Sequence, residues 1–512
     1  MRDRCFANRA VMLLGSAALL ASAPIAALST AHAQAHRKAA APAAKRQPNI
    51  LVIVADDLGF ADVSFNGAAV PTPNIDRIAK AGMVLDHFYT SALCSPSRAG
   101  LLTGNYPNRY GIMGDTITPG SDFGLDPGAE TIADVLGRAG YARRSFIGKW
   151  HLGHRSPEFH PMNFGFTSFY GHYNGAIDYF THKREGVVDW HRDREPSSDS
   201  GYSTDLMSDE AVRIISKPTP GGKPWMMWLA YNAPHGPLEA TDEDLKAVGF
   251  DPSKPRFGQK EAAVEGADYG AIGRGNSRRQ TALAMIHGMD RGIGRVLDAL
   301  KKTGQLENTV ILFTSDNGGP GHGASRGDGP SSNGPLRGWK FLHYEGGVRV
   351  AAAIAWPAGL RARRQAGVGA VSYVDLLPTL AHLAGARMEK PVDGQDMAAA
   401  LLSGRRPMGE RTLFVGEDYR VAPAYGERGP SDPESLRGRA PSVIVGKWKI
   451  VGDQLFDIDA DPSEKTDLAS QHPEVLKRLQ GVAAKFIALR TIPREKLNAT
   501  HLPPLPRWEL PR

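Results

Sequence analysis

Residues 49–57 read Asn-Ile-Leu-Val-Ile-Val-Ala-Asp-Asp, and this stretch indicates the fold class. The aliphatic residues 50–54 predict a strand buried on both faces, because a strand with one solvated face alternates apolar and polar side chains. Similar apolar runs recur along the chain, at 145–147, 225–231 and 310–313. Helical patterns separate them, at 72–82, 130–140 and 280–302. The alternation predicts an α/β fold with a large, mostly parallel sheet flanked by helices.

The C-terminal part has a different pattern. From about residue 404 the helical periodicity weakens, and short strands are predicted at 412–415, 442–445 and 448–451. We therefore expect a catalytic domain over residues 48–400 and a small C-terminal α+β subdomain over residues 401–512.

The N-terminus is typical of an export signal. Three arginines within the first nine residues precede an apolar stretch at 11–27, and Ala31-His32-Ala33 forms a small-x-small cleavage signal. We predict a signal peptide over residues 1–33 and a disordered linker over residues 34–47; the alternative is a retained membrane anchor. The mature protein is then expected to be periplasmic or secreted, with no stable membrane association after signal cleavage.

The net charge of +7 does not point to an acidic partner. Residues 1–46 carry seven basic side chains and one aspartate, a net charge of +6, so the rest of the chain carries only +1. A nearly neutral mature chain gives no electrostatic reason to expect nucleic acid as a partner.

The chain has two cysteines, Cys5 and Cys94. Cys5 lies in the predicted signal peptide, so the mature chain keeps one thiol, which cannot form an intramolecular disulfide. A lone thiol in an oxidising compartment is a liability unless it is buried or used.

Acidic and amide side chains follow two of the predicted strands. Asp56 and Asp57 come after the first strand, and Asp316 and Asn317 come after the strand at 310–313. In open α/β sheets, ligand sites gather outside the carboxyl ends of the strands. An oxygen-only set of this kind suits calcium or magnesium better than zinc. Capped turns are the alternative explanation.

Cys94 opens a second distinctive segment, Cys94-Ser95-Pro96-Ser97-Arg98. Residues 99–103 read as the start of a helix, and a helix N-terminus favours an anionic group. Arg98 adds a fixed positive charge. A buried structural cysteine and a simple thiol nucleophile are the alternatives.

These motifs resemble the sulfatase family. Cys94-x-Pro96-x-Arg98 followed by Leu101-x-Thr103-Gly104 matches its signature, in which the cysteine is oxidised to formylglycine. Further matches occur in the family's order, at 148–153, 234–237, 315–318, 336–340, 345–350 and 455–464. The resemblance covers roughly residues 47 to 480. It implies an alkaline phosphatase-like fold and a formylglycine-generating enzyme as maturation partner.

The resemblance also implies a role for each matching position. Calcium would be bound by Asp56, Asp57, Asp316 and Asn317, with the modified Cys94 as a further ligand. Cys94, as the formylglycine hydrate, would attack sulfur, and Arg98 would hold that side chain. Lys149 and Lys340 would bind sulfate oxygens. His151 would contact the formylglycine hydroxyl, and His235 would face the leaving group.

These residue types suit the chemistry. A sulfate monoester repels nucleophiles, and a divalent cation with two lysines neutralises the charge that develops on its oxygens. An aldehyde hydrate offers a hydroxyl nucleophile, and its second hydroxyl then expels sulfate, which a serine could not do. A histidine can protonate the leaving alcohol.

The substrate is expected to be a sulfated carbohydrate, although an aryl sulfate could also be cleaved. Residues 170–190 are rich in aromatic side chains and include Asp178 and Asp189, which could bind sugar hydroxyls. Residues 175–180 resemble the N-acetylgalactosamine-4-sulfatase branch of the family. The alternative is that these aromatic side chains only pack against the sheet.

Two other functions stay open at this point. One is a phosphomonoester or phosphonate hydrolase of the alkaline phosphatase-like group, and the other is a non-catalytic binder of sulfated glycans. His343 and His322 lie near the metal loops in sequence and are weaker candidates for a direct role. The glycosylation sequon at Asn498-Ala499-Thr500 is interpreted as chance.

Overall fold

The computed structural model describes residues 46–112, 116–257, 272–321, 329–363, 367–407, 409–417 and 433–489. The predicted signal peptide, all but the end of the predicted linker, Cys5, His322 and the sequon at Asn498 lie outside these residues. None of the helices in the described ranges combines the length and the hydropathy that a bilayer crossing requires.

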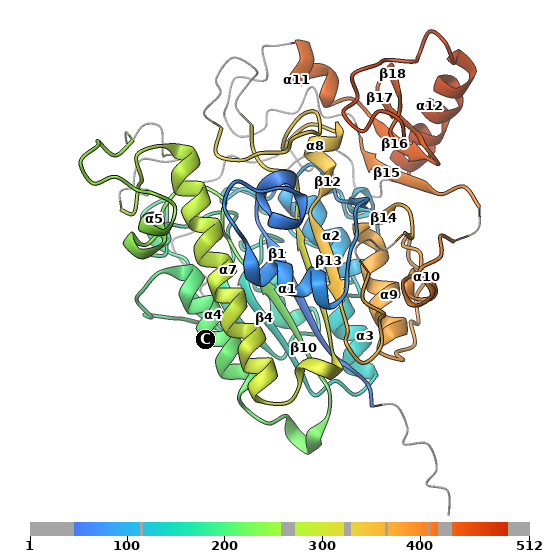
Figure 1. The fold of residues 1–512 in the computed structure, drawn as a ribbon. Helices are drawn as coiled ribbons and strands as arrows, with labels where there is room; N and C mark the ends of the chain where they lie inside the picture. Colours follow the sequence, from blue (N-terminus) through green and yellow to red (C-terminus); the bar gives the residue numbers. More distant parts are fainter. Residues whose placement is uncertain are drawn as a thin grey trace, which may run out of the picture. The chain divides into compact units, whose positions relative to one another are not determined.

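The core of the protein is a nine-stranded sheet with the order β2-β13-β11-β1-β10-β4-β5-β8-β9 (Figure 1). Its five central strands are parallel: β11 (Thr309–Ser315), β1 (Asn49–Ala55), β10 (Trp225–Ala230), β4 (Arg143–Lys149) and β5 (Ser168–His172). Antiparallel strands flank them: β2 (Met83–Val84) and β13 (Ala352–Ala355) on one side, β8 (His191–Arg192) and β9 (Glu195–Pro196) on the other. The predicted mixed, mostly parallel sheet is confirmed.

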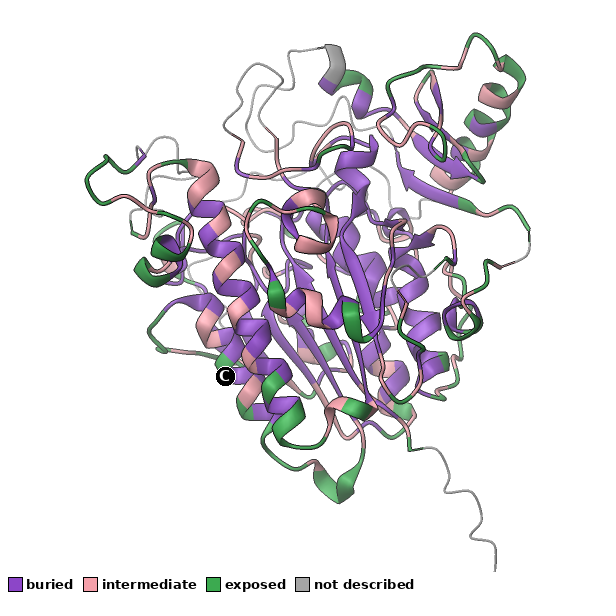
Figure 2. Ribbon diagram, viewed as in Figure 1, coloured by how far each residue is buried: buried purple, intermediate pink, exposed green. Residues whose placement is uncertain are grey.

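Both faces of the sheet are covered by helices. In β1, Ile50, Val52 and Val54 join one hydrophobic cluster, and Leu51 and Ile53 join the other. The first cluster includes α2 (Cys94–Thr103), α3 (Ile132–Arg138), α9 (Leu376–Leu383) and α10 (Ala398–Ser403). The second includes α1 (Pro73–Ala81), α4 (Ser203–Ile215), α5 (Asp242–Ala247) and α7 (Arg278–Lys302). Figure 2 shows the central strands buried between these layers, as the uninterrupted apolar run of β1 requires.

One helix begins earlier than expected. The sequence predicts a helix from about residue 99, but α2 starts at Cys94 itself. The first-turn position of Pro96 explains the difference, because a residue there has no intrahelical carbonyl to bond and loses nothing by lacking an N–H. Cys94 is therefore the first helical residue, and the whole of α2 is buried.

The C-terminal strands form a separate antiparallel sheet in chain order. It consists of β15 (Thr412–Gly416), β16 (Ser442–Val445), β17 (Trp448–Val451) and β18 (Gln454–Asp457). Helix α12 (Pro473–Ile487) packs against β16 and β17. This small sheet with its helix is the predicted C-terminal α+β element, while the domain boundary at 400/401 stays a prediction.

The remaining elements are short. Two small sheets consist of β12 (Arg349–Val350), β3 (Phe88–Tyr89) and β14 (Val371–Ser372), and of β6 (Lys183–Arg184) and β7 (Val187–Val188). The short α-helices are α8 (Glu345–Val348) and α11 (Pro433–Gly438). The 3-10 helices are η1 (Phe60–Asp62), η2 (Ser64–Asn66), η3 (Pro107–Tyr110), η4 (Pro157–Phe159), η5 (Pro161–Asn163), η6 (Pro220–Gly222), η7 (Leu306–Asn308) and η8 (Tyr373–Asp375).

Candidate active site

The carboxyl ends of four parallel strands and the start of α2 bring the predicted site residues together. Asp56 and Asp57 follow β1, Asp316 and Asn317 follow β11, Lys149 ends β4 with His151 just beyond it, His235 lies after β10, Cys94 and Arg98 belong to α2, and Lys340 precedes α8. These are the positions at which open α/β sheets place their ligand sites. All ten residues lie within the described ranges.

The charged side chains at this edge of the sheet form three ion pairs. Lys149 Nζ lies 2.6 Å from Asp56 Oδ2, and Lys340 Nζ lies 2.9 Å from Asp57 Oδ1. Arg98 makes a forked contact with Asp316 Oδ2, at 2.7 Å from its terminal nitrogen and 3.0 Å from Nε. Three buried carboxylates therefore face three buried cations.

Burial and the neighbouring charges shift the pKa values of Asp56 and Asp57 in opposite directions. Burial and the nearby Asp316 carboxylate raise the pKa of Asp56 to about 7. Burial also acts to raise the pKa of Asp57, but Lys340 and His235 outweigh it and lower that pKa to about 2.

Cys94 lies beside the first two carboxylates. Its Sγ is 3.5 Å from Asp56 Oδ1 and 4.0 Å from Asp57 Oδ1, and the residue is only 1% exposed. One ligand atom each from Asp56, Asp57, Cys94 and His235 lie within 4.8 Å of one another. This spacing could hold a metal ion. An atom that replaces the Cys94 Sγ would lie at the edge of that metal site.

Asn317 presents an acceptor that has no hydrogen-bond partner among the described residues. Its Nδ2 donates to Asp57 Oδ1 at 2.7 Å and to the Gly318 carbonyl at 2.9 Å, which fixes the orientation of the amide. The opposite atom, Oδ1, is buried and has no hydrogen-bond partner among the described residues. A buried orphan oxygen beside carboxylates fits a hard, oxygen-binding cation such as calcium.

His151 has a similar orphan atom. Its Nε2 lies 3.0 Å from the Ile117 carbonyl, which can only accept, so Nε2 carries the proton. Nδ1 is then an acceptor, and it is buried without a partner in the described part of the chain. A hydroxyl donor would satisfy it.

Ser95 holds His151 beside the cysteine, a role that the sequence analysis missed. Its Oγ donates to the His151 carbonyl at 2.9 Å and accepts from the Ile117 backbone N–H at 3.0 Å. Its place directly after Cys94 in the motif was the one available signal.

His235 is the most open of the charged and cysteine side chains at this edge. Its Nδ1 donates to the Gly236 carbonyl at 2.6 Å, and its Nε2 lies 3.6 Å from Asp57 Oδ2. Burial lowers the pKa of His235 well below its usual value. The side chain is 12% exposed, against 5% for Asp57 and 7% for Lys340, so it lies on the more open side of the cluster.

The predicted sugar-binding role of Asp178 and Asp189 is wrong. Both are buried and accept backbone N–H groups: Asp178 Oδ1 accepts from Phe180 and Thr181, and the Asp189 oxygens accept from Tyr173 and Asn174. The aromatic side chains nearby are also core residues, namely Tyr170, Tyr173, Tyr179 and Trp190. The alternative reading, that this segment packs against the sheet, is the one the structure supports.

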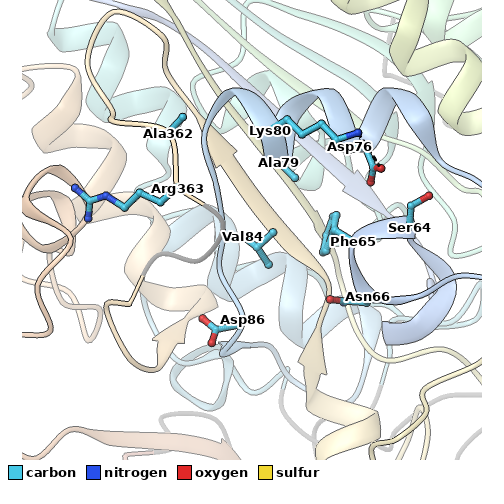
Figure 3. Close-up of a pocket in the computed structure, with 10 residues that line it drawn as sticks. All are labelled: Ser64, Phe65, Asn66, Asp76, Ala79, Lys80, Val84, Asp86, Ala362 and Arg363. Carbon is cyan, nitrogen blue, oxygen red and sulfur yellow. Dashed lines mark ion pairs between the residues drawn. The ribbon is translucent and has the colours of Figure 1, made fainter.

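A cavity of about 650 Å³ lies elsewhere, beside the edge strand β2 and helix α1 (Figure 3). Phe65, Asp76, Lys80, Val84 and Asp86 are among the residues that line it. It contains none of the predicted site residues. This cavity therefore does not mark the predicted site.

Comparison with known proteins assigns the family. The Sulfatase family model matches residues 48–386. N-acetylgalactosamine-6-O-sulfatase of Bacteroides thetaiotaomicron is 31% identical over 85% of this chain and 92% of its own length. N-acetylgalactosamine-6-sulfatase of Mus musculus is 32% identical over 73% of this chain and 69% of its own length. The crystal structure of Ps i-CgsB in complex with k-i-k-neocarrahexaose superposes with a TM-score of 0.71 and 30% identity, covering 87% of this chain and 94% of that one.

The chain belongs to the sulfatase family. Its fold is the alkaline phosphatase-like fold of that family, and it is a sulfuric ester hydrolase.

Proposed function

We propose that this sulfatase cleaves sulfate esters of a carbohydrate, using formylglycine made from Cys94 and one bound calcium ion. The observation that carries the proposal is the site itself. Three carboxylates and three cations surround Cys94, and two orphan acceptors, Asn317 Oδ1 and His151 Nδ1, lie among them.

The donor set supports calcium. Asp56, Asp57, Asp316 and Asn317 offer only oxygen ligands, and the orphan Oδ1 of Asn317 lacks the partner that a cation would supply. When present, calcium supplies positive charge for the sulfate oxygens, and the formylglycine hydrate supplies a hydroxyl nucleophile. Because the side-chain charges at this edge balance, one divalent cation would leave a net positive site for an anionic ester.

The surroundings of Cys94 support its modification. It is a free, buried cysteine at the start of α2, inside Cys94-x-Pro96-x-Arg98. The orphan Nδ1 of His151 suits a hydroxyl donor at this position, which a thiol would serve poorly. The proposal requires a formylglycine-generating enzyme as partner during maturation.

The remaining charged residues have separate roles at residue 94, at the sulfate oxygens and at the leaving alcohol. Arg98 is fixed by Asp316 and by the Lys149 carbonyl at 2.9 Å, so its charge is held next to residue 94. Lys149 and Lys340 point their ammonium groups into the carboxylate cluster, where they can bind sulfate oxygens. His235 lies on the open side, where the leaving alcohol would depart; the negative charge of a bound sulfate ester would favour the protonated imidazole that this alcohol needs.

A sulfated carbohydrate is proposed as the substrate because of the relatives. Two proteins at about 30% identity are named for a sulfate of N-acetylgalactosamine, and Ps i-CgsB was crystallised with k-i-k-neocarrahexaose. An aryl sulfate should also be cleaved, since a phenol leaves without much help. Export to the periplasm or to the outside, as the N-terminal sequence predicts, would bring the enzyme to polymeric substrates.

The experiment is a desulfation screen of purified protein, with coexpressed formylglycine-generating enzyme. The panel contains sulfated galactosamine, glucosamine and galactan oligosaccharides, 4-nitrophenyl sulfate, and matching phosphate and phosphonate esters. Release of sulfate from at least one saccharide is the expected result. Turnover of aryl sulfate alone would contradict the carbohydrate assignment. Faster turnover of the phosphorus esters would favour the phosphoester or phosphonate hydrolase, and binding without turnover a non-catalytic glycan binder.

A further inference from the structure

Hydrogen bonds and ion pairs from the C-terminal part of the chain hold the segment that carries Lys340. We call residues 335–345 the lysine loop. It leads into α8, which begins at Glu345, and its Lys340 Nζ lies 2.9 Å from Asp57 Oδ1. An ammonium group at the end of four methylenes is only as well placed as the backbone that carries it, so the supports of this loop bear on the site.

Contacts from residues beyond 437 hold the loop along its length. The backbone N–H of His343 donates to the Gly438 carbonyl at 2.7 Å, and His343 Nδ1 donates to the Ala440 carbonyl, also at 2.7 Å. Tyr344 donates its hydroxyl proton to Gln454 Oε1 at 2.7 Å. His343, a sequence candidate for a direct role, is thus a loop anchor.

The turn at Ser463 and Glu464 holds the other end of the loop. Ser463 Oγ donates to the Pro335 carbonyl at 2.9 Å, and Arg337 donates to the Glu464 carbonyl at 3.0 Å. Arg337 also lies over the Tyr344 ring, 4.0 Å from its centroid. The loop is therefore bonded to the C-terminal part on both sides of Lys340.

A buried cluster of three charged side chains joins the lysine loop to the C-terminal part of the chain. Lys449 Nζ lies 2.8 Å from Glu345 Oε1 and 2.9 Å from Glu464 Oε1, and all three side chains are fully buried. Glu464 Oε2 also accepts the backbone N–H of Glu345 at 2.6 Å, where the loop ends and α8 begins. Charges this deep are costly unless they are paired, so the cluster fixes the geometry of the three residues relative to one another.

The same cluster is connected through α8 to the segment that carries Asn317, a predicted metal ligand. Helix α8 begins at Glu345, and its Gly347 carbonyl accepts the backbone N–H of Gly318, the residue after Asn317, at 2.9 Å. The two segments pack so closely that a Cβ on Gly318 would lie 1.9 Å from the Gly346 carbonyl oxygen. A shift of α8 would therefore move the Asn317 end of the site together with Lys340.

We propose that Lys449 and Glu464 are positioning residues, which act through Glu345 to hold Lys340 where it binds the sulfate group. This inference rests on the sulfate-binding role proposed for Lys340. Both residues lie outside the segment matched by the family model, residues 48–386. The C-terminal sheet, through β17, is on this account a structural part of the active site.

The test removes the lysine and one carboxylate together, as Lys449→Met/Glu464→Gln, so that the net charge is unchanged. The readouts are kcat, KM and the inhibition constant of inorganic sulfate, the reaction product, in purified matured enzyme. We expect the sulfate inhibition constant to rise about 10-fold or more, because a small displacement of a binding group is costly. The matched control is Lys447→Met/Asp457→Asn, which removes an ion pair of the same sheet whose Nζ and Oδ2 lie 2.6 Å apart at the surface. It should change the inhibition constant by less than about 2-fold.

A double-mutant cycle with Lys340→Met separates positioning from general destabilisation. In the Lys340→Met background, the Lys449/Glu464 changes should cause a smaller loss of sulfate affinity than in the native background, because part of their effect acts through the missing ammonium group. Equal losses in both backgrounds would overturn the inference. Should the double variant not fold, Glu464→Gln alone keeps an acceptor for the Glu345 N–H and should show the same non-additivity.

The outcomes also distinguish this inference from the proposed function. If Lys340→Met leaves the sulfate inhibition constant unchanged, the sulfate-binding role of Lys340 fails. If Lys340→Met raises it but the Lys449/Glu464 variants do not, the proposed function stands and the positioning role is overturned.

Discussion

Two groups of buried aspartates in this protein do different things. At the strand ends, Asp56, Asp57 and Asp316 face the side-chain cations of Lys149, Lys340 and Arg98. In the segment after β5, Asp178 and Asp189 accept backbone N–H groups, and Asp189 also pairs with the side chains of Asn174 and His191. Backbone donors fix a turn and leave no room for a ligand, whereas a crowd of charged side chains with orphan acceptors can exchange one partner for another. The partner of a buried carboxylate, more than its burial, indicates whether it serves structure or chemistry.

The largest difference between the two groups should appear in activity. Asp316→Asn keeps the shape of the side chain but removes a charge that pairs with Arg98 and is predicted to bind calcium. We expect kcat/KM to fall by about 1000-fold, a magnitude typical of losing a main electrostatic group. Asp189→Asn, the matched change in the other group, should cost less than about 10-fold in the same assay. Similar losses for both would remove the distinction drawn here.

Metal removal tests the role of the aspartates at the strand ends without any mutation. Incubation with a strong calcium chelator is expected to lower turnover by about 100-fold or more, because the sulfate oxygens lose their main counter-charge. Added calcium should restore activity, and elemental analysis should find about one calcium per chain. Unchanged turnover after exhaustive chelation, with no metal detected, would contradict the calcium proposal.

His235 sharpens the assignment within the first group. His235→Ala should lower turnover of a sugar sulfate by about 100-fold, since an alcohol leaves poorly without a proton. The same variant should lose less than about 10-fold on 4-nitrophenyl sulfate, whose phenol departs as an anion. Equal losses on both substrates would reassign His235 to sulfate binding.

The smallest effect concerns stability. Asp189 accepts the backbone N–H groups of Tyr173 and Asn174 at 3.0 and 2.8 Å and lies 3.1 Å from His191 Nε2. Asp189→Asn should lower the free energy of unfolding by about 1–3 kcal/mol, as measured by denaturant titration. The Tyr173 carbonyl also accepts the backbone N–H of His151 at 3.0 Å, so this substitution could displace His151. Because the proposed contact of His151 is with the formylglycine hydroxyl and not with the leaving group, any such loss of activity should be equal on sugar and aryl substrates.

This stability difference should depend on pH. Burial acts to raise the pKa of Asp189, but the hydrogen bond and charge of His191 outweigh it and hold that pKa well below its usual value. A carboxyl with a lowered folded-state pKa stabilises the fold above its unfolded pKa of about 3.9, and loses this contribution as the pH falls further. The gap between the native protein and Asp189→Asn should therefore be full near neutrality and shrink below about pH 4. A gap that grew on acidification would contradict this account.

The sequence predicted the strand ends well and the second aspartate group badly, for a physical reason. Uninterrupted apolar runs have one explanation, a sheet buried on both faces, and they place Asp56 and Asp316 at neighbouring strand ends. Asp178 and Asp189 stand among aromatic residues, and no local pattern tells whether such side chains face a ligand or the core. The pairing of Lys449 and Glu464 with Glu345 was also out of reach, because a side-chain contact between the C-terminal part and α8 leaves no periodic pattern in either segment.

Modification of Cys94 is the central claim, and mass spectrometry of the peptide that contains it is the most direct test. In active protein, coexpressed with a formylglycine-generating enzyme, the thiol at position 94 should be replaced by an aldehyde. Across preparations, turnover should rise in proportion to the modified fraction, and Cys94→Ala should lose activity by a factor on the order of 10⁶. Full turnover in a preparation with an intact Cys94 thiol would contradict the account.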